Sequence, residues 1–277
     1  MIRLFCCDLD DTLLNIHHTS VERIIDAVHK IIGEGYFMAI NTGRSFFQSR
    51  VPGLEKMYTI CCNGACIKDV KGNLIYESLI DKDLIGELLD TIDPKMPLDF
   101  VTSEHVYTSG TYDEIFARMQ NIDPSRKPAD CDEIFNRGFK FGCSKEEILK
   151  QDIVKINGMK DDPLLFEQLQ RFADENKDRL VNNPTNETIA EITNVGIDKG
   201  SGAARLADLL SLSEDQVQVY GDGGNDIPAL KRFKHSYAPS TALAQAKDAA
   251  FEIIGPYDQY SVTDHMLNTV EKQKLTS

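Results

Sequence analysis

The chain begins with the stretch Ile2-Arg3-Leu4-Phe5-Cys6-Cys7-Asp8-Leu9-Asp10-Asp11-Thr12, in which an apolar run leads directly into acidic residues. Carboxylates at the exit of a buried strand lose hydration, and a cation, a polar partner or a bound proton must offset that loss. The simplest explanation for such a costly placement is a cation site that handles a phosphoryl group. The stretch therefore predicts one part of a functional site, whose other parts must come from elsewhere in the chain.

Residues 1–82 alternate predicted strands and helices after this opening. Apolar residues recur at helical spacing between positions 21 and 32, and further apolar strands are expected at residues 36–41 and 58–62. Strands that are apolar without alternation, and that are separated by helices, are typical of a parallel sheet covered on both faces. The chain is therefore predicted to have an α/β fold built on a parallel sheet.

The pattern of elements changes near residue 83. Helical stretches at 83–92, 112–120 and 163–176 alternate with short strands at 98–102 and 153–158, and a charged, loop-like segment spans 121–133. The first pattern returns near residue 190, with a helix that opens at Lys199 and an apolar strand at 217–220. We therefore expect an inserted α+β domain at residues 83–188, within a core domain formed by residues 1–82 and 189–277.

The charge balance restricts the partners that the protein can have. Its 277 residues include 30 Lys and Arg but 44 Asp and Glu, which gives a net charge of −14. Such an acidic surface argues against nucleic acid and anionic membranes as partners, and an anionic substrate then needs a local positive site. The N-terminus has no charged leader, and no apolar run reaches about 18 residues, so we expect a cytoplasmic protein.

Seven cysteines are distributed along the chain, at positions 6, 7, 61, 62, 66, 131 and 143. Their odd number and the apolar surroundings of the first four favour reduced thiols in the core, where free cysteine is often found. Cys62 and Cys66 have three residues between them, but no second Cys or His pair follows at the spacing of a zinc site. We therefore expect plain core cysteines.

Asp8, Asp10 and Asp11 form the first of four segments that could build one site. Asp8 is expected at the end of its strand, where the carboxyl edge of a parallel sheet binds ligands. A carboxylate there can attack phosphorus, and Asp10 can protonate the leaving oxygen and later take a proton from water. The alternative is an Asp-rich capping turn. A calcium loop is excluded, because Leu13 and Thr19 occupy the positions of its glycine and glutamate.

Two further segments could bind an anion. Thr42-Gly43-Arg44 lies between a predicted strand and a helix, where a hydroxyl, a glycine amide and a helix N-terminus can bind phosphate. Arg44 can contact the substrate or hold a loop, and the alternative for the segment is an ordinary N-cap and turn. Lys199 opens a helix, where an ammonium opposes the helix dipole; this suggests a role beside aspartate and phosphate, with a solvated surface lysine as the alternative.

The fourth segment is Gly221-Asp222-Gly223-Gly224-Asn225-Asp226, which follows another apolar strand. Its glycines let the backbone approach a ligand closely, and two carboxylates four residues apart suit Mg²⁺, which prefers oxygen ligands. The alternative is a glycine-rich turn in which Asn225 or Asp226 caps the next helix. Each of the four segments follows a strand or opens a helix of the same predicted sheet, so they are expected to form one site.

The order and spacing of these segments resemble those of the haloacid-dehalogenase-like superfamily of phosphotransferases. Within it, the chain is most similar to Cof-type sugar-phosphate phosphatases, which carry a large α/β cap of type IIB between the second and third motifs. The resemblance extends over nearly the whole chain and includes Asn63-Gly64-Ala65 after the third strand. It implies a Rossmann-like core and an inserted domain at 83–188 that acts as a cap and selects the substrate.

The resemblance also implies roles for individual residues. Asp8 would be the nucleophile, and Asp10 the general acid and base. Thr42 would bind the transferring phosphoryl group together with the amide of Gly43, and Lys199 would neutralise charge on the nucleophile and the phosphate. Further substrate contacts are expected from Asp11, Arg44 and Asn63.

Magnesium is the cofactor that the resemblance implies. Its ligands would be the Asp8 carboxylate, the Asp10 backbone carbonyl and the Asp222 carboxylate. Asn225 and Asp226 would lie behind them, acting through water or by orienting the ligands. The site would thus need only positioning and charge neutralisation, as phosphoryl transfer generally does.

The function predicted is that of a magnesium-dependent phosphatase acting on a small phosphorylated metabolite, a sugar phosphate, through an aspartyl-phosphate intermediate. Asp11 departs from the family pattern, because a glycine usually follows the second catalytic acid; a backbone amide remains there, so activity is expected to survive. Two alternatives stay open: a sugar phosphomutase of the same superfamily, and a catalytically silent metabolite-binding regulatory protein. The sequence does not define the oligomeric state.

Overall fold

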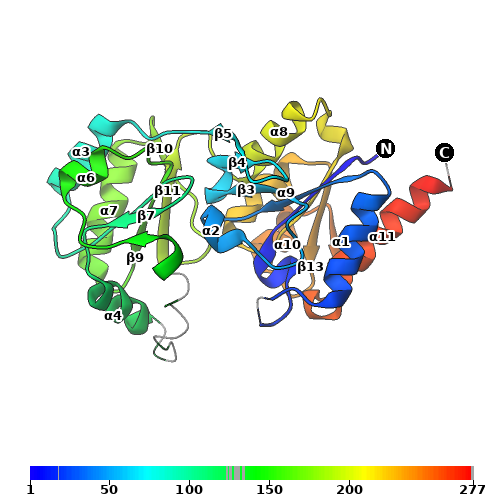
Figure 1. Ribbon diagram of the computed structural model, residues 1–277, viewed down its shortest axis with the longest axis horizontal. Coiled ribbons are helices and arrows are strands. Elements are labelled where there is room, and N and C mark those ends of the chain that lie inside the picture. The colour runs from blue at the N-terminus through cyan, green and yellow to red at the C-terminus, as the bar shows by residue number, and fades with distance from the viewer. Residues whose placement is uncertain (18, 123, 125–126, 128–131, 133–134, 276–277) are drawn as a thin grey trace. The chain divides into compact units, whose positions relative to one another are not determined.

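The structure is a computed structural model that describes residues 1–275 except for 18, 123, 125–126, 128–131 and 133–134 (Figure 1). It divides into two compact units. The first contains Met1–Arg44, Ser49–Tyr76 and Asp198–Ser277, and the second contains Ser45–Gln48 and Glu77–Ile197. Each unit has its own β-sheet and its own hydrophobic core. The chain thus begins in the first unit, builds most of the second as a long insertion, and returns to complete the first.

An eight-stranded sheet in the order β14-β13-β12-β1-β2-β3-β4-β5 forms the centre of the first unit. Its strands are β1 (Leu4–Cys7), β2 (Phe37–Asn41), β3 (Tyr58–Cys61), β4 (Cys66–Lys68), β5 (Leu74–Glu77), β12 (Val217–Tyr220), β13 (His235–Pro239) and β14 (Glu252–Ile254). Neighbouring strands from β14 to β3 run parallel, and β4 pairs antiparallel with β3. The predicted α/β fold with a parallel-sheet core is confirmed.

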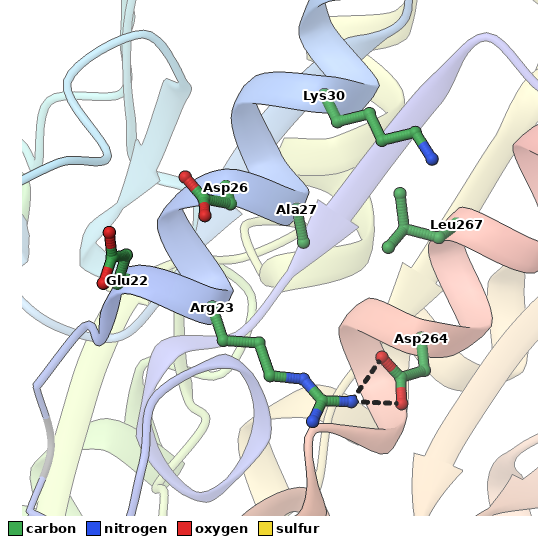
Figure 2. Close-up of a pocket in the computed structure, with 7 residues that line it drawn as sticks. All are labelled: Glu22, Arg23, Asp26, Ala27, Lys30, Asp264 and Leu267. Atoms are coloured by element: carbon green, nitrogen blue, oxygen red, sulfur yellow. Dashed lines mark hydrogen bonds and ion pairs between the residues drawn. The ribbon is translucent and has the colours of Figure 1, made fainter.

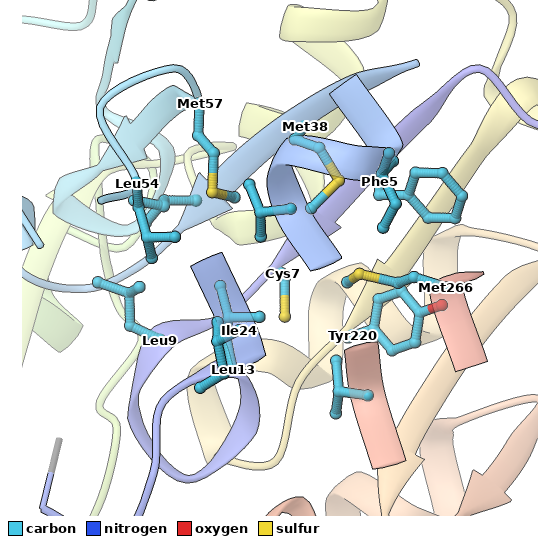
Figure 3. Close-up of a cluster of buried hydrophobic side chains, with 14 of the residues drawn as sticks. Phe5, Cys7, Leu9, Leu13, Ile24, Met38, Leu54, Met57, Tyr220 and Met266 are labelled. Atoms are coloured by element: carbon cyan, nitrogen blue, oxygen red, sulfur yellow. The ribbon is translucent and has the colours of Figure 1, made fainter. Parts of the chain in front are cut away.

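Helices cover both faces of this sheet, which explains why β1 is apolar without alternation. The helices are α1 (Glu22–Gly33), α8 (Lys199–Leu209), α9 (Ile227–Arg232), α10 (Ala244–Ala249) and α11 (Ser261–Lys274). Phe5 and Cys7 of β1 pack in a cluster with α1 and α11, part of which Figure 3 shows. Leu4 and Cys6 point to the opposite face and pack with α8, α9 and α10. All four side chains of β1 are fully buried, which leaves no solvated position for a charged residue within the strand. The first acidic residue, Asp8, therefore follows the strand.

The second unit has a six-stranded sheet in the order β10-β11-β9-β6-β7-β8. Its strands are β6 (Asp99–Val101), β7 (Val106–Thr108), β8 (Phe139–Lys140), β9 (Lys155–Met159), β10 (Leu180–Asn182) and β11 (Ile189–Asn194). Its helices are α2 (Phe46–Ser49), α3 (Lys82–Thr91), α4 (Tyr112–Ile122), α6 (Lys145–Leu149) and α7 (Pro163–Glu175). Phe100, Ile156 and Ile192 are register neighbours on one face of the sheet, and they pack in one core with α3, α6 and α7.

The insertion ends at positions that differ from those given by the sequence pattern. Contacts divide the chain at residues 77 and 197, whereas the sequence placed the boundaries at 83 and 188. The largest difference arises from β11, which pairs with β9 and β10 and therefore extends the sheet of the second unit. The loop expected at 121–133 falls largely on residues outside the described part of the chain, as does Cys131.

Candidate active site

Asp8 and Asp222 follow two strands that are neighbours in the first unit. The last residues of β1 and β12, Cys7 and Tyr220, are register partners, and the amide of Asp8 donates to the Tyr220 carbonyl oxygen at 3.0 Å. Asp222 comes two residues after Tyr220. Because parallel strands bring their carboxyl ends to the same edge, the two acids meet at the edge where α/β sheets bind ligands.

Asp8, Asp222 and Asp226 form an acidic group around Lys199. One carboxylate oxygen from each of the three lies within 4.8 Å of the others. The Lys199 ammonium lies 2.8 Å from Asp8 Oδ1 and 2.8 Å from Asp226 Oδ1. Because Lys199 is only 1% exposed, it is a buried ion-pair partner and not a solvated surface lysine. The structure thus brings the first, third and fourth sequence segments together.

Hydrogen bonds between side chains and the backbone hold Lys199 in this position at the start of α8. The side chain of Asp198 accepts a hydrogen bond from the Ser201 amide at 2.7 Å and caps the helix, and Asn41 Nδ2 donates to the Lys199 carbonyl at 3.0 Å. The helix start also lies against the loop after β3: a Cβ atom at Gly64, whose φ is +95°, would lie 2.2 Å from the Asp198 carbonyl oxygen. Glycine at position 64 is therefore required both by backbone conformation and by the close approach of α8.

Burial and crowding of like charges dominate the electrostatics of the acidic group. Burial raises the pKa of Asp8 well above its usual value, and the charges of Asp226 and Asp222 act in the same direction, while Lys199 opposes them. Burial, followed by the charge of Asp226, raises the pKa of Asp222 to about 7. Burial alone would lower the pKa of Lys199, but the adjacent carboxylates of Asp226 and Asp8 outweigh it and raise that pKa. Lys199 is therefore a permanent cation in a group with excess negative charge.

The donor set of this group fits a magnesium ion. Three carboxylates and one ammonium carry two surplus negative charges when all are ionised, and a divalent cation would balance them. Carboxylate oxygens are the ligands that Mg²⁺ prefers. Asp226 is held by three polar contacts: its Oδ1 accepts from Lys199, and its Oδ2 accepts from the amides of Asp222 at 3.2 Å and Gly223 at 3.0 Å.

Thr12 belongs to the same site although the sequence reasoning gave it no role. Its hydroxyl donates to Asp222 Oδ1 at 2.7 Å, and the side chain is buried. This bond fixes the carboxylate that follows β12 to the loop that follows β1. The sequence contained one indication of this role: a hydroxyl residue ends the acidic run that follows the first strand.

Asp10 and Arg44 form a pair beside the acidic group. Arg44 Nε donates to Asp10 Oδ2 at 2.8 Å, and Nη2 donates to Asp10 Oδ1. The guanidinium therefore binds the carboxylate through two parallel hydrogen bonds. The Asp10 carboxylate is therefore directed to Arg44 and is absent from the acidic cluster of Asp8, Asp222 and Asp226 found among the described residues. Arg44 therefore holds a loop, and its predicted contact with a substrate stays a prediction.

Thr42 and Gly43 lie in the loop that follows β2. The Thr42 hydroxyl accepts a hydrogen bond from the Arg44 amide at 3.2 Å. The segment was expected to open a helix, but α2 begins only at Phe46 and has four residues, so a helix N-terminus is not part of this anion site. The amides and hydroxyl of the loop remain the groups that could contact a phosphate.

Asn63 and Asn225 join the loops that follow β3 and β12. Asn225 Nδ2 donates to Asn63 Oδ1 at 3.0 Å, and both side chains are buried. The amide of Asn63 in turn donates to the Thr42 carbonyl at 3.1 Å. Asn63 therefore fixes the relative positions of two loops of the site, in addition to the substrate contact expected from the sequence.

The backbone at Asp11 explains why a glycine is usual at this position. Asp11 has φ +50°, in the left-handed region that glycine enters freely and that aspartate tolerates better than most residues. Its exposed side chain turns toward Tyr257: burial, and then a hydrogen bond with Asp11, raise the pKa of Tyr257 to about 12. The departure from the family pattern thus keeps the required conformation and adds one contact.

A substitution at Asp11 is expected to report this backbone requirement. Asp11→Val places a β-branched residue in the left-handed region and should lower the free energy of unfolding by about 1–2 kcal/mol, whereas Asp11→Gly should not. Urea denaturation of the two variants and the native protein measures the difference. Equal losses in both variants would assign the effect to the Tyr257 contact instead.

A separate hollow of about 450 Å³ lies between α1 and α11 in the first unit (Figure 2). Its lining is largely charged, and Arg23 donates to both carboxylate oxygens of Asp264 across it, at 3.0 and 2.8 Å. None of the residues predicted for the site lines this hollow. The acidic group at the sheet edge therefore remains the candidate active site.

No helix in the described part of the chain has the length and apolar character needed to cross a membrane.

Comparison with known proteins places the chain among phosphatases of one fold. A family model described as haloacid dehalogenase-like hydrolase matches residues 5–266. The 5-amino-6-(5-phospho-D-ribitylamino)uracil phosphatase YbjI of Escherichia coli is 22% identical, with coverage of 95% of this chain and 94% of its own. Phosphatase YwpJ of Bacillus subtilis is 23% identical, with coverage of 96% and 99%.

Solved structures show the same fold. A haloacid dehalogenase-like hydrolase from B. subtilis superimposes with a TM-score of 0.81 at 24% identity, over 96% of this chain and 99% of that one. The subclass IIB sugar phosphatase BT4131 gives a TM-score of 0.74 at 18% identity, over 96% and 98%. The predicted enzyme class, a phosphoric monoester hydrolase, is confirmed. The chain belongs to the haloacid dehalogenase-like hydrolase family.

Proposed function

We propose that the protein is a magnesium-dependent phosphatase that uses Asp8 as its nucleophile. The observation that carries this proposal is the acidic group of buried Asp8, half-buried Asp222 and buried Asp226 beside Lys199, at the carboxyl edge of a parallel sheet. An ordinary ion pair on a protein surface has one carboxylate and one ammonium, whereas here two carboxylates contact one buried ammonium and a third lies beside them. Such an arrangement is costly unless a cation and a ligand complete it.

The proposed reaction has two displacements at phosphorus. An Asp8 carboxylate oxygen attacks the phosphorus of the ester, the bond to the substrate oxygen breaks, and that oxygen leaves with a proton from Asp10. Water then attacks the aspartyl phosphate, gives its proton to Asp10, and frees Asp8 and inorganic phosphate. Lys199 stays charged throughout, so it can stabilise the negative charge on Asp8 and on the transferring phosphoryl group.

Mg²⁺ would be held by the carboxylates of Asp8 and Asp222 and by the Asp10 carbonyl, with Asp226 close enough to orient these ligands. When bound, it supplies positive charge that favours approach of a carboxylate to a phosphate dianion. Thr12 would hold the Asp222 carboxylate in its orientation through the hydrogen bond described above.

Arg44 would position Asp10 for proton transfer. Its two parallel hydrogen bonds limit the rotation of the Asp10 carboxylate, which otherwise projects from an irregular loop. Thr42 and Gly43 follow β2 at the same sheet edge and would bind the phosphoryl oxygens. Asn63 would keep this loop in register with Asn225.

We further propose that the substrate is the phosphate ester of a small polyhydroxylated metabolite, such as a sugar or sugar alcohol, and that the second unit selects it. Two kinds of relative support this class: YbjI acts on a phosphorylated ribitylamino compound, and BT4131 is a sugar phosphatase. A panel of such esters, with phosphate release as the readout, identifies the substrate. Isomerised ester without free phosphate would instead indicate a mutase.

Removal of the metal tests the cofactor. With p-nitrophenyl phosphate as a generic substrate, chelation of divalent cations should lower the turnover by at least about 10²-fold, because the surplus negative charge of the acidic group would repel the phosphate. Added Mg²⁺ should restore it. Turnover that is indifferent to the chelator would exclude the proposed metal requirement.

A further inference from the structure

Three buried thiols of the first unit converge at a place that the proposed reaction does not use. The sulfur atoms of Cys61, Cys62 and Cys66 all lie within 4.8 Å of one another. All three residues are fully buried, and none of the three forms a disulfide. The sequence pattern indicated plain core cysteines, because only the pair Cys62 and Cys66 was visible as a spacing; the third sulfur joins them through strand pairing.

The backbone shows how the three sulfurs come together. Cys61 ends β3 and is the register partner of Cys66, the first residue of the antiparallel strand β4. Residues that follow one another in an extended strand point to opposite faces, so Cys62 would normally point away from Cys61. Cys62 instead adopts φ +53°, a left-handed conformation that costs a non-glycine residue about 1–2 kcal/mol. This turn places its sulfur within the same group as the other two.

A buried cation lies near the thiols. Lys68 is two residues after Cys66 on β4, is fully buried, and acts electrostatically on Cys61. Hydrogen bonding with Cys62, together with burial, raises the pKa of Cys61, whereas a hydrogen bond with Cys66 and, to a smaller extent, the charge of Lys68 lower it. Hydrogen bonds with Cys61 and Cys62, together with burial, raise the pKa of Cys66. The three buried sulfur atoms are therefore grouped near a buried basic side chain.

We propose that Cys61, Cys62 and Cys66 form a binding site for a soft monovalent cation, Cu(I). Sulfur ligands select soft ions, whereas the carboxylates around Lys199 select hard ions such as Mg²⁺. Among the described residues, no histidine or carboxylate belongs to the thiol group, so it lacks the fourth ligand of a structural zinc site. A metal–sulfur distance of about 2.3 Å would separate the three sulfurs by about 4 Å in a trigonal plane, which the observed spread of 4.8 Å or less allows.

Binding of Cu(I) leaves only a small net charge in the buried group. Binding forms three Cu–S bonds, and each thiol that becomes a thiolate gives its proton to solvent. Cu(I) with two thiolates and one thiol carries one negative charge, and the buried Lys68 lies two residues from Cys66 on the same strand. No electron is transferred, since the ion arrives and remains as Cu(I).

Copper loading of the full chain tests the site. Reduced protein is mixed anaerobically with Cu(I) held by a weak competing chelator, desalted, and analysed for copper per chain. We expect about one tightly bound Cu(I) per native chain and at least a tenfold weaker affinity for Cys61→Ser/Cys66→Ser. Cys6→Ala, which removes an equally buried thiol, and Cys143→Ser should bind as the native protein does. Equal affinity in the double variant, or no binding by the native chain, would overturn the proposal.

A second measurement needs no variant and so does not depend on folding of a substituted core. The native chain, with and without Cu(I), is alkylated in partly denaturing conditions and mapped by peptide mass spectrometry. Copper should slow the alkylation of Cys61, Cys62 and Cys66 by at least about tenfold while leaving Cys143 unaffected, because a ligand that binds the folded state suppresses its opening. Unchanged alkylation of the three thiols in the presence of bound copper would place the ion elsewhere and reject the site.

Discussion

Asp8→Asn is expected to lower phosphatase turnover by about 10⁴-fold or more while leaving the protein at least as stable as the native form. The amide cannot form the acyl phosphate, so the first displacement is lost, and each factor of ten corresponds to about 1.4 kcal/mol of transition-state stabilisation. Stability should not fall, because Asp8 is one of two carboxylates that contact the Lys199 ammonium, and Asp226 remains as its partner.

Two measurements separate these effects. Phosphate release from an aryl phosphate gives the turnover, and urea denaturation without metal gives the free energy of unfolding. Asp264→Asn, which breaks the ion pair of α11 with Arg23, removes the same charge outside the acidic group and serves as the control. Residual turnover in Asp8→Asn comparable to that of the control would mean that another group attacks phosphorus.

Lys199→Met is expected to have the largest effect on stability. It leaves the carboxylates of Asp8 and Asp226 buried without their common partner, and removal of one member of a buried ion pair costs about 3–5 kcal/mol. Turnover should be lost as well, since no fixed positive charge would remain beside the nucleophile.

Lys274→Met is the control for Lys199→Met, because it removes the same ammonium from an ion pair that is exposed instead of buried. The Lys274 ammonium lies 2.7 Å from a Glu34 carboxylate oxygen, close to the distances from Lys199 to its two carboxylates. Both Lys274 and Glu34, however, have side chains that are more than one third exposed. Its substitution should change the free energy of unfolding by less than about 1 kcal/mol, because solvent screens exposed pairs. Equal losses in the two lysine variants would show that burial does not govern the Lys199 interactions.

The part of the site that could be predicted from the sequence consists of groups at strand ends. Asp8 and Asp222 each follow an apolar strand, and parallel pairing of β1 with β12 then brings them together. Lys199 could be identified because it opposes the dipole of its own helix. The order of these motifs predicted the family, which the matching family model confirmed.

The remaining features depend on short-range geometry that leaves little trace in a pattern. The pair of Asp10 with Arg44 and the bond from Thr12 to Asp222 join loops that are distant in sequence. The left-handed backbone conformation of Asp11 could be recognised only from its φ angle in the structure. In the second unit, strands of two or three residues, such as β8 and β10, are too short to show periodicity in the sequence.

The central position of β1 has a consequence for biosynthesis. Its neighbour β2 follows soon after it, but β12 lies roughly 200 residues later in the chain. At a synthesis rate of about 5–20 residues per second, the ribosome needs about 10–40 s to supply that partner. During this interval β1 presents an apolar edge with unpaired backbone groups, which is a template for aggregation. The nascent chain should therefore depend on chaperone protection until its C-terminal third emerges, and the catalytic ion pair can form only at that late stage.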